Sequence, residues 1–294
     1  LKSNSPLSRG VTSKKVAVEI YPNHPIPIKD MMKKAILLAT VSALTFGAQA
    51  GDWGKAPVGK APIEECVDLG GEISVGWMSE YYYKGFQFAD SSVWADVNYT
   101  FEGLAVPVTV GVFYVNGIDT HSIFPNTDQG ELYVSAAVGT FAGFEVNVGY
   151  SHHFYPEQGR GPFSPSSSLG EVGLDVRRSL GFVDFVAQSN YLFNDAGWYH
   201  ELGLEKSIGL TDNISLVLAG GAGYSDKLTA RESGWNHYYL RASLPIQLNC
   251  RTVLTPYIGY HISQGDQLFR PFVIPPFDAL EDSLHGGVSL SVSF

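Results

Sequence analysis

The last seven residues of the sequence alternate strictly between apolar and small polar side chains. Apolar residues occupy positions 288, 290, 292 and 294, and serines occupy the three positions between them. Successive side chains of a β-strand point to opposite faces, so the four apolar side chains would share one face. A strand of this kind that ends on an aromatic residue, here Phe294, is typical of the closing strand of a transmembrane β-barrel. The segment therefore predicts an all-β membrane protein.

The same alternation runs through residues 71–294, and no stretch shows a convincing helical period. We recognise twelve alternating segments, at 71–84, 91–101, 106–116, 129–141, 144–155, 168–180, 183–193, 197–208, 213–224, 235–247, 252–262 and 285–294. Strands of roughly ten residues are long enough to cross a bilayer when tilted. The sequence predicts one antiparallel transmembrane β-barrel of about twelve strands.

The connections between these segments alternate in length. Short ones lie at 102–105, 142–143, 181–182, 209–212 and 248–251, and longer ones at 85–90, 117–128, 156–167, 225–234 and 263–283. The connection 194–196 is the exception, because it is short where a long one is expected. This pattern predicts short periplasmic turns, long extracellular loops and both ends of the barrel in the periplasm. The apolar, proline-rich loop 263–283 would fold inward or form a contact surface.

The residues before the barrel divide into three parts. Residues 31–50 read as a secretory signal peptide, with a basic start, an apolar run and Ala48-Gln49-Ala50 as the cleavage pattern. Residues 1–30 are expected to be an upstream extension, and residues 51–70 a periplasmic linker. Export without an apolar helix long enough to span a bilayer predicts the bacterial outer membrane as the location.

The charge of the predicted mature chain excludes one class of partner. Residues 51–294 contain 12 Lys and Arg against 27 Asp and Glu, a formal net charge of −15. Binding to nucleic acid needs clustered basic residues, so none is expected. The 32 glycines and 13% aromatic content would also suit a secreted β-sandwich. A β-sandwich does not require short and long connections to alternate. Because the connections of this chain do alternate, the barrel is favoured.

Alternation also assigns the two faces of the strands. The apolar side chains of 106–114, 214–222 and 240–246 are expected to face lipid. Aromatic residues near strand ends are expected to form interfacial girdles, namely Tyr81, Tyr83, Tyr99, Phe101, Phe144, Tyr150, Tyr191, Phe193 and Tyr260.

The opposite face is polar and mostly acidic, and it must line the interior because charge facing lipid costs several kcal/mol, on the order of 2–4 at mid-bilayer. Its predicted carboxylates are Glu72, Glu80, Asp96, Glu131, Glu145, Glu171, Asp175, Asp184, Glu201 and Glu205, and its cations are Lys84, Arg177 and Arg241. One interpretation is a filled, hydrogen-bonded plug. The other is a narrow channel whose negative field favours cations. A barrel of about eight strands has an interior that side chains fill, and one of about sixteen strands leaves an open channel. A barrel of twelve strands lies between these two sizes.

Two segments carry a family resemblance. Ser79-Glu80-Tyr81-Tyr82-Tyr83-Lys84-Gly85-Phe86 resembles the opening Ser-Asp-Tyr-x-x-Arg-Gly signature of the TorF-type porin family, also called Gcw_chp, and residues 149–156 resemble that family's strand ending in Tyr-Pro. The similarity spans residues 71–225. Glu80 and Lys84 stand where the family more often has Asp and Arg. The resemblance implies an outer-membrane barrel of the porin type, without a particular solute, and barrel-assembly machinery that recognises Phe294.

Chemical sites are sparse. Ser151 and His153 share the interior face of one segment, and Glu131 or Glu171 could orient the histidine, so an outer-membrane hydrolase stays an alternative. The histidines show no ligand spacing for a metal, and no cofactor motif occurs.

Cys66 and Cys250 would both be periplasmic, where a disulfide between them can form, with two free thiols as the alternative.

Together these features predict a porin-like channel for small solutes with cation preference, not an enzyme, embedded in outer-membrane lipid. A structural or surface-interaction barrel without transport is the alternative. The sequence does not indicate an oligomeric state.

Overall fold

The computed structural model describes residues 69–120, 128–155, 168–193, 196–228, 233–264 and 282–294. The predicted extension, signal peptide and linker up to residue 68, and the interior of loop 263–283, lie outside these ranges. The described strands are β1 (Gly71–Met78), β2 (Tyr81–Tyr83), β3 (Phe86–Phe101), β4 (Val108–Thr120), β5 (Gln129–Phe141), β6 (Phe144–Phe154), β7 (Ser168–Ser179), β8 (Asp184–Leu192), β9 (Gly197–Gly209), β10 (Ser215–Asp226), β11 (Ser233–Ser243), β12 (Ile246–Gln247), β13 (Thr252–Ser263) and β14 (Ser283–Ser293). Within this part of the chain no helix is long and apolar enough to cross a membrane.

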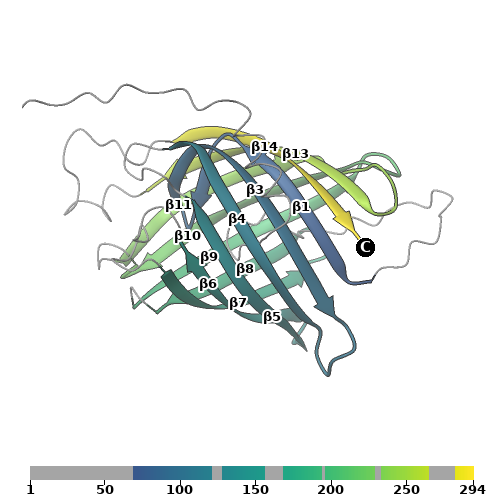
Figure 1. Cartoon of the computed structure of the whole chain (residues 1–294), viewed down its shortest axis with the longest axis horizontal. Helices are drawn as coiled ribbons and strands as arrows, with labels where there is room; N and C mark the ends of the chain where they lie inside the picture. Colours follow the sequence, from purple (N-terminus) through teal and green to yellow (C-terminus); the bar gives the residue numbers. More distant parts are fainter. Residues whose placement is uncertain (1–68, 121–127, 156–167, 194–195, 229–232, 265–281) are drawn as a thin grey trace, which may run out of the picture. The chain divides into compact units, whose positions relative to one another are not determined.

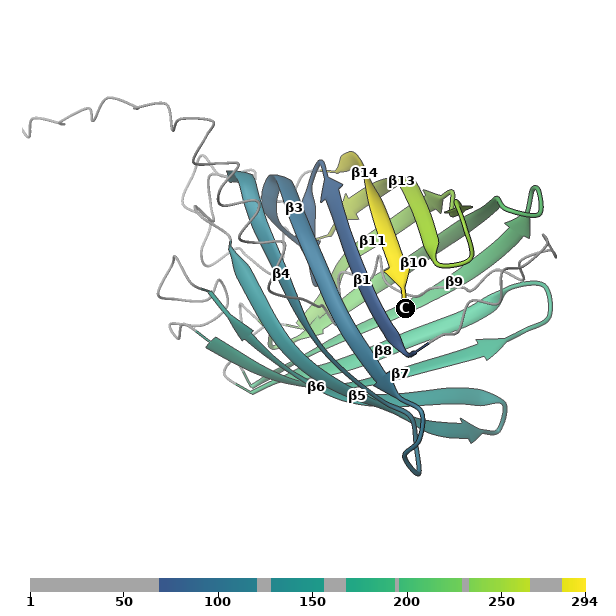
Figure 2. The same ribbon diagram turned by 45° about the vertical axis from the view of Figure 1, so that its right-hand side comes forward.

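The strands form one closed antiparallel barrel. From β3 to β11 each strand pairs with the next strand in the chain, β11 pairs with β13 and β13 with β14. β1 pairs with both β3 and β14, which joins the two edges of the sheet. Of the fourteen strands, β2 extends the β1–β3 hairpin and β12 is a short pairing beside β13, so twelve strands make the wall. Figures 1 and 2 show these strands tilted and wrapped around a common interior. The predicted fold class is confirmed.

The outer face of the barrel is apolar, as the alternation predicts. Where β14 meets β1, Trp77 pairs with Val288 and Val75 with Leu290. Val75 and Trp77 are 45% and 43% exposed, whereas Ser289 on the opposite face is 7% exposed. Exposed leucine, valine and aromatic side chains continue around the wall on every second residue. An apolar belt on a closed barrel is a surface that lipid can cover without unpaired backbone groups.

The two ends of the barrel differ. At one end, β1 begins and β14 ends, and the amides of Leu69 and Gly71 donate to the carbonyl of Phe294 at 2.9 and 3.1 Å. The short turns after β3, β5, β7, β9 and β11 lie at this end, which corresponds to the predicted periplasmic side. The long connections join the strands at the other end, called here the loop end.

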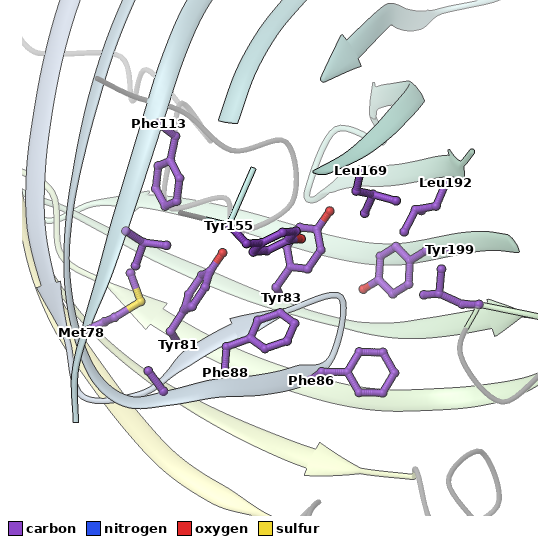
Figure 3. Packing of buried hydrophobic residues seen from close by; sticks show 13 residues of the cluster. Met78, Tyr81, Tyr83, Phe86, Phe88, Phe113, Tyr155, Leu169, Leu192 and Tyr199 are labelled. Carbon is purple, nitrogen blue, oxygen red and sulfur yellow. The ribbon is translucent and has the colours of Figure 1, made fainter. Parts of the chain in front are cut away.

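The prediction for the first two segments is wrong in one respect. No loop occupies 85–90. β1 stops at Met78, and a two-residue turn at Lys84 and Gly85 joins β2 directly to β3, with positive φ angles of 49° and 82°. Two positive φ angles are the requirement of the tight type I′ hairpin turn, which glycine satisfies without strain. Residues 79–89, the inward hairpin, bend from the loop end into the barrel (Figure 3).

This bend also overturns part of the predicted aromatic girdle. Tyr81 and Tyr83 are completely buried in the interior instead of lying at the membrane surface. The alternation could not distinguish a hairpin inside the barrel from a strand in its wall, because side chains point to opposite faces with a period of two residues in both.

Candidate functional site

The inward hairpin crosses the barrel and packs against its far wall. Its aromatic side chains form the centre of the buried apolar cluster (Figure 3). This cluster consists of Met78, Tyr81, Tyr83, Phe86, Phe88, Ala89, Phe113, Val115, Tyr155, Leu169, Leu192, Tyr199 and Leu228. The partners come from β4, from Tyr155 just after β6, from β7 to β9 and from the β10–β11 connection, so the hairpin narrows the interior at the loop end.

A buried ion pair fixes the tip of the hairpin. Lys84 Nζ lies 2.8 Å from Glu171 Oε1 on β7, and both side chains are almost fully buried. The same carboxylate accepts hydrogen bonds from Tyr83 OH at 2.8 Å and from the amide of Asn190. The ammonium group also lies about 5 Å from the ring centres of Tyr83 and Tyr199. Tyr83 and Lys84 therefore share one buried carboxylate.

Two further hydrogen bonds tie the hairpin to other strands. Tyr81 OH donates to Gln129 Oε1 on β5 at 3.1 Å. On β11, the Asn236 amide donates to the backbone carbonyl of Lys84 at 3.0 Å and to Ser225 at 2.9 Å. The tip is therefore held by polar contacts on β5, β7 and β11, and not by apolar packing alone.

The Ser151 and His153 pair lies directly beneath the hairpin. Ser151 Oγ is 3.3 Å from His153 Nε2, and Glu131 Oε2 is 3.4 Å from His153 Nδ1. This order of groups matches a nucleophile, base and orienting acid. However, Tyr83 OH also lies 3.2 Å from His153 Nε2, and the Gln129 amide lies 3.0 Å from Nδ1.

These contacts make His153 a support for the hairpin in the observed arrangement. Ser151 is 1% exposed and His153 is completely buried, so a substrate has no access to either residue while the hairpin is in place. The arrangement therefore gives no basis for hydrolysis without movement of the hairpin.

A second charged cluster lies nearer the periplasmic end. Arg177 on β7 lies 2.5 Å from Asp184 Oδ2 and 3.0 Å from Glu205 Oε1, on β8 and β9. Glu145 on β6 is the cross-strand partner of Arg177. The antiparallel register brings these four residues together, although 60 positions separate Glu145 from Glu205 in the sequence.

The other predicted interior residues are spread around the wall. Glu72 on β1 accepts from Ser74 at 2.9 Å, and Asp96 on β3 accepts from Asn98 at 3.3 Å. Asp175 faces the same way as Glu171 and Arg177 on β7, and Arg241 lies on β11. Glu201 on β9 accepts from Tyr199 at 2.5 Å and from Gln188 at 3.4 Å.

Two predicted residues are not on the wall. Glu80 begins the inward hairpin and accepts from Tyr82 at 2.8 Å, and Lys84 is at its tip.

A cavity of about 160 Å³, called here the side cavity, remains between the inward hairpin and β8 to β14. Histidine and tyrosine rings form much of its wall. Tyr82 stacks on His261 with ring centres 4.1 Å apart, and His261 stacks on His237 at 4.8 Å. Within the described residues, no group of three or more His, Cys, Asp or Glu could hold a metal ion.

The sequence did not identify the residues that receive the hairpin, among them Gln129, Asn236 and His261. One signal was present: Lys84-Gly85 stands between two alternating aromatic segments, which is the pattern of a two-residue hairpin turn. Cys250 lies between β12 and β13, but Cys66 lies outside the described residues, so their disulfide stays a prediction.

No family model matches the chain, and no curated protein matches it in sequence. Among solved structures it is similar to the KdgM porin, with 8% identity and a TM-score of 0.47 over 76% of this chain and 99% of that one. The NanC porin has 11% identity and a TM-score of 0.43 over 76% and 98% of the two chains. LpxR from Salmonella typhimurium has 6% identity and a TM-score of 0.43 over 76% and 100%.

Proposed function

We propose that this protein is a bacterial outer-membrane pore for small solutes, with a preference for cations, and that the inward hairpin controls its passage. The observation that carries the proposal is the polar attachment of the hairpin. A permanent plug could be held by apolar contacts at lower cost, since a buried ion pair often stabilises no more than apolar residues of similar size. An ion pair instead offers one defined closed position that can be released, which suits a gate.

The preference for cations rests on the charge of the interior. The ten predicted interior carboxylates exceed the three cations by a formal charge of seven. Glu171 offsets Lys84, and Asp184 and Glu205 offset Arg177, so neither cation leaves a positive field. Acidic walls with a low-dielectric surround concentrate cations and repel anions.

Recording in a planar bilayer under a KCl gradient tests this function. We expect a reversal potential of the sign that K⁺ selectivity produces. The double variant Glu145→Gln/Asp175→Asn should move that potential toward zero, because both carboxylates face the interior. Glu102→Gln, in the exposed β3–β4 turn, is the matched control and should leave it unchanged. Anion selectivity, or equal shifts in both variants, would contradict the proposal.

The second candidate is a structural or surface-interaction barrel, which the tight burial of the hairpin favours. The two functions differ in what happens when the hairpin is released. A protein that conducts no ions either as wild type or as Lys84→Met, despite a folded barrel, would support the structural function. Membership of the TorF-type family also remains a proposal, and its signature segment coincides with the inward hairpin.

A further inference from the structure

The side cavity owes its shape to small residues on β10. The inward positions of this strand carry Ala219, Gly221 and Gly223, and Gly221 pairs with Gly203 on β9. A Cβ atom on Gly221 would come within 2.8 Å of the Tyr239 ring, and one on Gly223 within 3.0 Å of Tyr199 OH. Without side chains at these positions, the rings can lie against the wall and the space in front of them stays open.

The cavity presents acceptors that the protein does not use. Glu205 is 2% exposed and its Oε2 atom has no hydrogen-bond partner, although Oε1 accepts from Arg177. Gln188 Oε1, on the same wall, also has none. Buried acceptors without partners are costly, so two of them on residues that line one cavity favour a donor that arrives from outside the protein.

The charges of the cavity favour a positive donor. Its lining contains the carboxylates of Glu80, Glu201 and Glu205 against the cations of Arg241 and Lys84. Glu171 already neutralises Lys84 at 2.8 Å, and Asp184 shares with Glu205 the neutralisation of Arg177, so carboxylates remain in excess. The tyrosine rings add to this preference, because the face of an aromatic ring attracts cations.

We propose that the side cavity binds a small organic cation that carries N–H donors, such as a primary ammonium or a guanidinium ion. The N–H groups would donate to Glu205 Oε2 and Gln188 Oε1, and the apolar part would lie against Tyr239 and Tyr199. The volume of about 160 Å³ sets the size. It resembles the cavity of about 150 Å³ that holds one benzene molecule in another protein. This inference rests on the proposed pore function only for the route by which the ligand enters.

Three probes of equal size and different charge test the proposal: n-butylamine, n-butanol and butyrate. Each is titrated calorimetrically into the full-length protein in detergent at pH 7, where the amine is protonated. We expect saturable binding of butylamine, at least about tenfold weaker binding of butanol and no binding of butyrate. Only the ammonium ion can form a charge-assisted hydrogen bond with a carboxylate. Because no transport is needed, a protein that fails to conduct can still bind, and a conducting one can fail to bind.

Two variants locate the binding site. Glu205→Gln removes the charge at the open acceptor and should weaken butylamine binding about tenfold. Ala219→Leu leaves every charge in place but fills the cavity, so it should abolish binding. Asp212→Asn, in an exposed turn, is the control and should match the wild type. Heat-dependent electrophoretic mobility shows that each barrel is folded. Butanol binding as tightly as butylamine, no saturable binding of butylamine, or wild-type affinity in folded Glu205→Gln would overturn the proposal.

Discussion

At the scale of single residues, Lys84 determines the position of the inward hairpin. Its ammonium group is fully buried and lies 2.8 Å from Glu171 Oε1. Removing one member of a buried pair typically costs about 3–5 kcal/mol, because the other charge is left without compensation. The hairpin can avoid that cost by moving away and letting water reach the carboxylate.

Lys84→Met is therefore expected to open the pore. The uncompensated Glu171 should draw water into the interior and displace the hairpin, which raises single-channel conductance above the wild-type value. Lys206→Met, at an exposed position on β9, serves as the control and should conduct as the wild type does.

A second substitution should reverse this effect. In Lys84→Met/Glu171→Gln the buried charge is gone, while the amide oxygen can still accept from Tyr83. Conductance should return toward the wild-type value, measured on the same bilayer. If the double variant conducts as much as Lys84→Met, the ion pair is not what holds the hairpin.

At the scale of elements, the β2–β3 hairpin depends on a turn that only a small residue can complete. Gly85 adopts a φ of 82°, and a Cβ atom there would collide with Asn236 and His237 on β11. Both the backbone conformation of the turn and the docking of the hairpin tip against β11 therefore require a residue without a side chain at position 85.

Gly85→Val should displace the hairpin tip from β11 and increase conductance, with a loss of stability of a few kcal/mol, on the order of 1–3 for backbone strain alone. Thermal unfolding and bilayer recording measure the two effects. Gly103→Val meets open space in the β3–β4 turn and should change neither. A normal conductance in a folded Gly85→Val protein would show that docking of the tip is not required for closure.

At the scale of the whole molecule, closure of β1 onto β14 places the start of the barrel two strands from β13, whose leading turn contains Cys250. The predicted bond to Cys66 would link the lead-in to that turn. Thiol labelling after denaturation without reductant should leave both cysteines unmodified, and prior reduction should expose two reactive thiols. Two reactive thiols without reductant would exclude the bond. The role of Phe294 in assembly likewise stays a prediction.

The wall of the barrel could be predicted well from the sequence, and the site only in part. The apolar side chains of Val75, Trp77 and Val288 face outward as alternation requires. Acidic residues of the wall strands such as Glu131, Glu171 and Glu205 fall on the inner face for the same reason. Alternation could not indicate that Glu171 binds Lys84, because the two are 87 positions apart in the chain.

The sequence by itself determined which side chains share a face, since a period of two is a local property of extended backbone. The Lys84-Gly85 pair also suits a two-residue hairpin turn, although alternation alone predicted a loop over 85–90. Only the tertiary structure decided that this turn points into the barrel. That choice depends on contacts with β5, β7 and β11, which become neighbours of the hairpin once the sheet closes. The side cavity arises in the same way, because its walls come from strands that only closure brings to face the hairpin.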